Sequence, residues 1–121
     1  MMINYDGRRF RPVAPGSPEE RRVAVYRQDG DLVWGEFSGG NARRGALTGS
    51  CRPDGTLEFA YCMVLNDGEV ISGHCRSTPR MLEDGRIRLD EVWERFGQHA
   101  STGVSSLEEI GDITGFERTN G

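Results

Sequence analysis

The chain has 121 residues and a formal net charge of −4, enough for one domain with one core and too few for two. Basic residues are interleaved with acidic ones rather than gathered on one face, so we expect no nucleic-acid partner. No apolar run approaches the roughly 20 residues that cross a bilayer, and the N-terminal residues lack the basic and apolar regions of a secretory signal. We therefore expect a cytoplasmic protein without membrane contact.

Asp-Gly and Gly-Gly turn signals recur along the chain, and the stretches between them alternate apolar and polar residues. Gly supplies the positive φ of tight hairpin turns and Asp tolerates it. We expect an all-β fold, a single up-and-down antiparallel β-barrel of about eight strands, over residues 1–110, with 111–121 as a flexible C-terminal tail. A two-sheet sandwich remains the alternative. The predicted elements are a hairpin in 2–13, a helical turn opened by Ser17 and Pro18, and strands near 21–28, 31–37, 42–52, 56–65, 69–78, 86–96 and 102–109.

Alternate residues of a strand face opposite sides of a sheet, so the pattern also predicts which side chains point into the barrel. In the strand 86–96 the inward set contains Glu91, between Leu89 and Trp93. Mid-strand glycines on inward faces indicate either sharp curvature or places where another group comes close. The other predicted inward residues are Leu57, Phe59, Tyr61, Met63 and Leu65; Ile71, Gly73, Cys75 and Ser77; Gly45, Leu47, Gly49 and Cys51; and Ile87 and Arg95.

Glu91 is the most informative single residue, because a buried carboxylate must be paired, hydrogen-bonded or protonated. One interpretation is structural, with Glu91 in an ion pair with Arg43 or Arg95. The other is functional, because burial beside an aromatic wall raises the pKa of a carboxyl and suits it to general acid or base catalysis. The functional interpretation expects Glu91→Gln to keep the fold and lose binding or turnover, whereas the structural one expects a loss of stability.

The remaining reactive residue types form no catalytic or metal-binding motif. Cys75 and His74 are neighbours in sequence but face opposite sides of their strand, so no Cys-His pair is predicted. The three cysteines lack C-x-x-C spacing and are expected to be free thiols, with a disulfide left open. The two histidines lack zinc-site spacing. We expect no metal and no cofactor. Trp34 is assigned to the core or a pocket wall. The predicted charge-paired outer wall contains Arg43, Arg44, Arg76, Arg80, Arg86, Arg88, Asp84, Asp90 and Glu94.

Three functions follow from this inward face. A mixture of apolar and polar side chains is typical of small-molecule sites, which predicts ligand contacts from Tyr61, Trp93, Ser77, Phe59, Met63 and Cys75. The alternative is a cofactor-free isomerase, cyclase or lyase, with Glu91 as the acid or base and Tyr61 as hydrogen-bond donor to an oxyanion. The second alternative is a structural or interaction protein with a filled barrel. The sequence leaves open whether the protein is an enzyme and whether it forms a homodimer.

Several segments together resemble a family of small bacterial proteins. They are 2–13, Ser38-Gly39-Gly40, 45–49, 73–79, 86–89 and Glu91-Val92-Trp93. The resemblance covers about residues 2–109 and implies a calycin-like barrel, similar to the lipocalin and avidin group. Sequences of this family are often labelled N-acetylglutamate synthase. An acyltransferase of that kind cradles a pyrophosphate with a Gly-rich turn between a strand and a helix. Because Gly39-Gly40 lies between two predicted strands, we expect no acetyl transfer.

Overall fold

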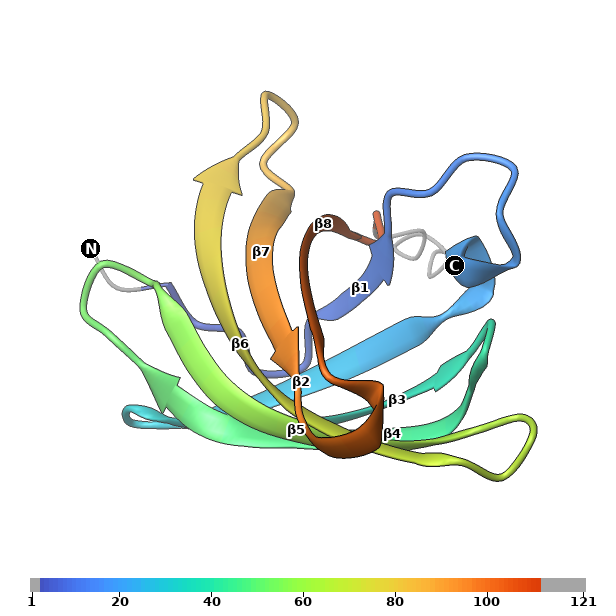
Figure 1. Cartoon of the computed structure of the whole chain (residues 1–121). Helices are drawn as coiled ribbons and strands as arrows, with labels where there is room; N and C mark the ends of the chain where they lie inside the picture. Colours follow the sequence, from blue (N-terminus) through green and yellow to red (C-terminus); the bar gives the residue numbers. More distant parts are fainter. Residues whose placement is uncertain (1–2, 112–121) are drawn as a thin grey trace.

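The computed structural model describes residues 3–111, which form a closed barrel of eight antiparallel strands in the order β1 to β8 (Figure 1). Each strand pairs with the next along the chain, and β8 closes the barrel by pairing with β1. The expected all-β, up-and-down barrel is confirmed. Its strands are β1 (Arg9–Pro12), β2 (Val23–Asp29), β3 (Leu32–Gly39), β4 (Ala42–Cys51), β5 (Leu57–Leu65), β6 (Val70–Met81), β7 (Ile87–Arg95) and β8 (Ser101–Glu109). The expectation for the tail concerns residues that lie, apart from Gly111, outside the described part.

The predicted turn signals act as expected. The carboxylates of Asp54, Asp67 and Asp84 each accept a hydrogen bond from the backbone N–H two residues later, at 2.9 to 3.1 Å. This contact is the Asx turn that makes Asp favourable before Gly. Two short 3-10 helices complete the described chain, η1 (Pro18–Arg21) and η2 (Gly97–His99). The Ser17 side chain accepts from the Glu19 N–H at the start of η1, so the predicted N-cap is confirmed.

The hairpin predicted in residues 2–13 is wrong in its first half. Only Arg9–Pro12 forms a strand, and residues 3–8 instead cover one end of the barrel. Tyr5 is completely buried there. Its hydroxyl donates to the Gly55 carbonyl at 2.6 Å, and its N–H donates to Oε1 of Gln28 at 2.8 Å. These bonds anchor the segment to the β2 and β4–β5 ends of the wall.

The inward faces follow the predicted alternation. Leu57, Leu89 and Ser77 are essentially inaccessible, whereas Val92 on the outer face of β7 is 61% exposed. The main core combines these inward residues with packed rings of Tyr5, Phe10 and Tyr26. Trp34 was assigned wrongly, since it lies outside on β3 and is 39% exposed. Its neighbours Val33 and Gly35 are buried on the inner face, so the alternation directs Trp34 outward.

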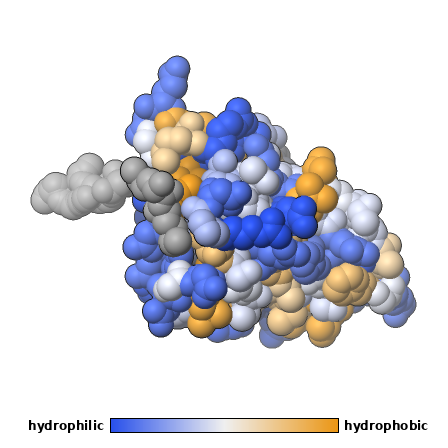
Figure 2. All heavy atoms as spheres, turned by 90° about the vertical axis from the view of Figure 1, so that its left-hand side faces the viewer, coloured by the Kyte–Doolittle hydropathy of each residue, from blue (hydrophilic) through white to orange (hydrophobic). Residues whose placement is uncertain are grey.

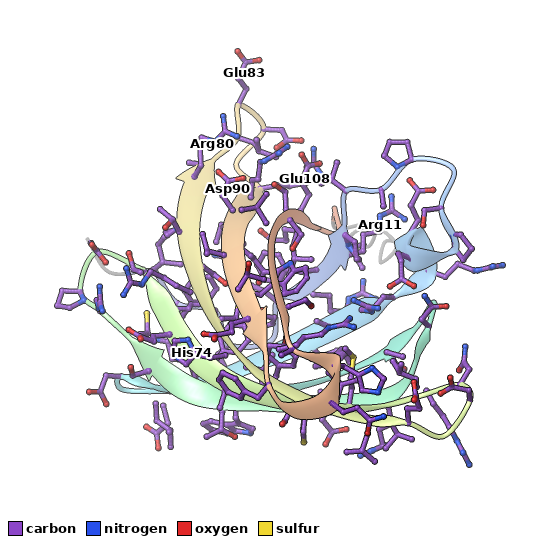
Figure 3. All side chains as sticks on the ribbon, in the orientation of Figure 1. Arg11, His74, Arg80, Glu83, Asp90 and Glu108 are labelled. Atoms are coloured by element: carbon purple, nitrogen blue, oxygen red, sulfur yellow. The ribbon has the colours of Figure 1, made fainter. Side chains whose placement is uncertain are left out.

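The outer wall of the barrel is held by cross-strand ion pairs, as predicted for most of its charged residues. Asp90 on β7 lies 3.7 Å from Arg80 on β6, and both side chains are labelled in Figure 3. Arg88 lies 3.1 Å from Asp90 on the same strand and 3.1 Å from Glu108 on β8. Arg43 and Glu94 form no such pair within residues 3–111. Hydrophilic residues predominate on the face in Figure 2, with hydrophobic residues in separate patches. Within the described part, no helix has the length and apolar character to cross a membrane.

Candidate functional site

The interior of the barrel contains a cavity of about 130 Å³. Its apolar wall includes Phe10, Phe37, Leu47, Phe59, Met63 and Leu107. Polar groups from β2, β5, β7 and β8 interrupt this wall, so the interior is neither uniformly apolar nor completely filled. They are Tyr26, Tyr61, Glu91, Arg95 and Ser105, with Arg22 immediately before β2.

The shortness of β1 gives the cavity an opening. Within residues 3–111, the ladder between β8 and β1 includes only Leu107–Glu109 of β8. The chain then leaves the wall after Pro12 and returns through η1 to Arg22. Pro12, Arg22 and the exposed Ser105 all line the cavity. The first half of β8 therefore borders an open side of the cavity rather than a continuous wall.

Three glycines hold aromatic rings flat against the inside of the barrel. Each glycine is the cross-strand partner of the aromatic residue that covers it. A methyl group placed on any of these glycines would overlap the ring. Glycine thus lets the ring lie over the backbone of the next strand, which leaves the centre of the barrel open. The pairs are Phe37 with Gly45, Tyr61 with Gly73, and Trp93 with Gly103, and they confirm the close approach predicted for Gly45 and Gly73.

Glu91 forms a polar cluster in the cavity wall with two serines. Ser77 Oγ donates to Glu91 Oε2 at 2.9 Å, and Ser105 Oγ donates to Oε1 at 3.4 Å. Burial raises the pKa of Glu91, and the hydrogen bond from Ser77 opposes this shift. Glu91 forms no ion pair within residues 3–111, and Arg43 is exposed on the outer surface. The predicted ion pair with Arg43 or Arg95 is therefore wrong, because hydroxyl groups take the place of the guanidinium.

Two further groups beside this cluster are kept neutral. Burial raises the pKa of the Cys75 thiol well above its usual range, and the nearby Glu91 carboxylate raises it further. Burial and Glu91 act in the same direction on the pKa of Tyr26. His74 lies on the outer wall with its Nε2 3.2 Å from Glu58 (Figure 3). Cys75 therefore has neither a thiolate nor a histidine base, as the sequence indicated. All three cysteines are free.

Aromatic and cationic side chains stand at the half-buried part of the cavity wall. The Arg95 guanidinium lies over the Trp93 ring, 5.6 Å from its centroid. Tyr61 donates its hydroxyl to the Glu94 carbonyl at 3.3 Å. Burial raises the pKa of Tyr61 while the nearby Arg95 charge lowers it. This hydroxyl is thus already engaged with backbone, which weakens its candidacy as an oxyanion donor.

The predicted site residues come together with one exception. Tyr61, Trp93, Phe59, Met63, Cys75 and Glu91 all line the cavity, whereas Ser77 lies behind Glu91 and is fully buried. The sequence interpretation missed Arg22 and Tyr26. Both could have been found from the alternation, because residues 22, 24 and 26 share one face of the predicted strand 21–28. Within residues 3–111, His, Cys, Asp and Glu side chains nowhere gather in a group of three that could hold a metal ion.

This geometry defines a small closed β-barrel with a partly polar internal cavity. Residues 3–110 match the family model described as avidin-like protein. The chain therefore belongs to the avidin-like protein family. Searches of curated proteins and of solved structures gave no match.

Proposed function

We propose that this protein binds a small molecule in the barrel cavity. The observation that carries the proposal is the cavity wall itself, in which apolar side chains surround a few convergent polar groups, the usual composition of small-molecule sites. Avidin-like barrels bind small molecules such as biotin, which supports a ligand inside the barrel. In this proposal Trp93, Phe59 and Met63 contact the body of the ligand, and polar side chains of the cavity wall hydrogen-bond its polar group.

The size of the cavity limits the ligand. A volume of about 130 Å³ is close to the roughly 150 Å³ that accommodates benzene in an engineered protein cavity. The proposed ligand is therefore a compact molecule with one ring or a short branched chain. A larger ligand must extend through the open side beside Pro12 and Ser105.

Trp93 provides the experiment. The chain contains two tryptophans, and Trp34 lies outside the barrel, so the variant Trp34→Phe leaves Trp93 as the reporter. A library of compact molecules, with biotin included, is screened for saturable changes in its emission. The binding expected for the parent is lost in Ala24→Leu, which adds volume to the cavity wall, and kept in Ala60→Leu, which adds it on the outer surface. Binding that survives Ala24→Leu, or no binding by any compound, would refute the proposal.

A second candidate function is cofactor-free acid–base chemistry on the bound molecule. It is favoured by Glu91, a cavity-lining carboxyl with a raised pKa beside Tyr26. Here Glu91 removes or returns a proton at carbon, as an isomerase, cyclase or lyase requires. A ligand found in the screen is incubated with the protein in D₂O and followed by NMR. Deuterium incorporation that disappears in Glu91→Gln supports catalysis; no incorporation with the wild-type protein leaves binding alone.

A further inference from the structure

We infer that the cavity selects a compact carboxylate, whose charged group is held by Arg22 and Arg95 while its apolar body fills the cavity. This inference rests on the proposed function, since it names the chemical class of the ligand. Both arginines line the cavity, as does Glu91, which shares the inner face of β7 with Arg95. An anion is the ligand whose charge these two arginines complement.

Arg22 has an unmet hydrogen-bonding need. One side of its guanidinium forms an ion pair with Glu19. Its Nε is buried and has no hydrogen-bond partner within residues 3–111. A buried N–H without an acceptor costs free energy. Because Arg22 lines the cavity, a rotation of its long side chain would turn Nε toward an acceptor there. A ligand carboxylate supplies that acceptor.

Arg95 presents the second charge. Within residues 3–111 it forms no ion pair with an acidic side chain, and its guanidinium lies over Trp93. The stacked ring restricts the side chain, so less conformational entropy is lost when an anion binds. Arg22 approaches the cavity from the start of β2 and Arg95 from the end of β7, and these two strands lie on either side of β8 and β1. Both therefore border the open side.

The shape of the cavity favours a carboxylate over a bulkier anion. Guanidinium groups recognise planar carboxylates through paired N–H donors. A planar head leaves most of the cavity for an apolar ring or branched chain against Phe37, Phe59 and Met63. A cationic ligand is disfavoured by Arg95, which lines the cavity and whose charge is paired with no acidic side chain within residues 3–111.

Three probes that differ in charge but hardly in size test the inference: benzoate, benzamide and benzylamine. Each is titrated at pH 7.5 into the Trp34→Phe protein, followed by Trp93 emission and calorimetry. We expect benzoate to bind at least tenfold more tightly than the other two. Arg22→Met and Arg95→Met should each weaken benzoate about tenfold or more and reduce its preference over benzamide. Arg27→Met removes the same charge from the exposed face of β2. It should change neither the affinity for benzoate nor the preference for benzoate over benzamide.

The outcomes separate this inference from the proposed function. Equal affinities for benzoate and benzamide overturn the inference and leave a cavity that binds neutral molecules. So does a loss of benzoate affinity in Arg27→Met as large as in Arg22→Met and Arg95→Met. Preference for benzylamine overturns it in favour of Glu91 as the charged partner. If none of the probes binds while other compounds in the library do, the inference is wrong and the proposed function stands. If nothing binds at all, both are wrong.

Discussion

Ser77 and Glu91 are direct cross-strand partners on β6 and β7, and the serine hydroxyl donates to the carboxylate at 2.9 Å. Ser77 is completely buried, so this bond is shielded from solvent competition. It lets a carboxyl group sit in the barrel wall without an ion pair. The ionised form is stabilised by hydroxyl donors, and burial still disfavours it.

Removing the donor should make Glu91 harder to ionise. We expect Ser77→Ala to raise the pKa of Glu91 further, because the Ser77 hydrogen bond lowers it in the native protein. The pKa is measured by NMR titration of the labelled Glu91 carboxyl carbon. Ser105→Ala is the matched control, and its longer bond of 3.4 Å should give a smaller shift. An equal or larger shift in Ser105→Ala contradicts the assigned hydrogen bonds.

Glu91 should also leave a signature in the pH dependence of stability. Its pKa is raised in the folded state, so the folded protein holds this proton more tightly than the unfolded chain does. The resulting stabilisation is present below the unfolded-state pKa and is lost as pH rises through the folded-state pKa. Glu91→Gln lacks this loss. As pH rises between the unfolded-state and folded-state pKa values of Glu91, we expect the unfolding free energy of Glu91→Gln to increase relative to that of the wild type. The increase is at most about 1.4 kcal/mol per pH unit.

The measurement is chemical denaturation of both proteins between pH 4 and 8. At neutral pH we expect Glu91→Gln to cost about 1 kcal/mol or less, because no buried guanidinium loses its partner. Glu36→Gln changes an exposed carboxyl on β3 and should show no comparable trend. A difference in unfolding free energy between wild type and Glu91→Gln that is independent of pH contradicts the raised pKa. A loss of roughly 3–5 kcal/mol in Glu91→Gln would indicate that Glu91 belongs to a structural ion pair.

Gly103 should control the size of the cavity through Trp93. A Cβ at this position overlaps the indole ring, so Gly103→Ala should push the ring into the cavity and destabilise the fold by roughly 1–3 kcal/mol. Trp93 emission should shift, and ligands of the parent protein should bind more weakly. Gly111→Ala is the control, since its added Cβ meets only Arg86 at an ordinary 3.7 Å. Unchanged emission and binding in Gly103→Ala would show that the ring does not depend on this glycine.

Tyr5→Phe tests the closed end of the barrel. The variant keeps the ring and removes the hydroxyl that donates to the Gly55 carbonyl. It leaves a buried carbonyl without its partner, which should cost about 1–3 kcal/mol of unfolding free energy. Tyr61→Phe loses only the longer, exposed bond to Glu94 and should cost less. Equal stability of Tyr5→Phe and the wild type would argue against this anchor.

The sequence determined the fold because turn chemistry and period-2 alternation are local. Asp and Gly select each hairpin over a few residues, and consecutive hairpins dictate the strand order once β8 meets β1. The same alternation placed Glu91, Tyr61 and Trp93 on the inside. Where local signals were misleading, a distant contact was stronger: Tyr5 lies across the barrel end because its hydroxyl finds Gly55, fifty residues away.

Only the tertiary structure decided what surrounds those inward residues. Period 2 predicts which way a side chain points but not which groups it contacts. The sequence therefore predicted Arg43 or Arg95 as the partner of Glu91, whereas in the structure Ser77 and Ser105 are its partners. The tertiary structure also shows the opening left by the short β1, and the Nε of Arg22 beside the cavity, which has no hydrogen-bond partner within residues 3–111. Such features depend on the closure of the barrel and the length of each pairing, which no single strand encodes.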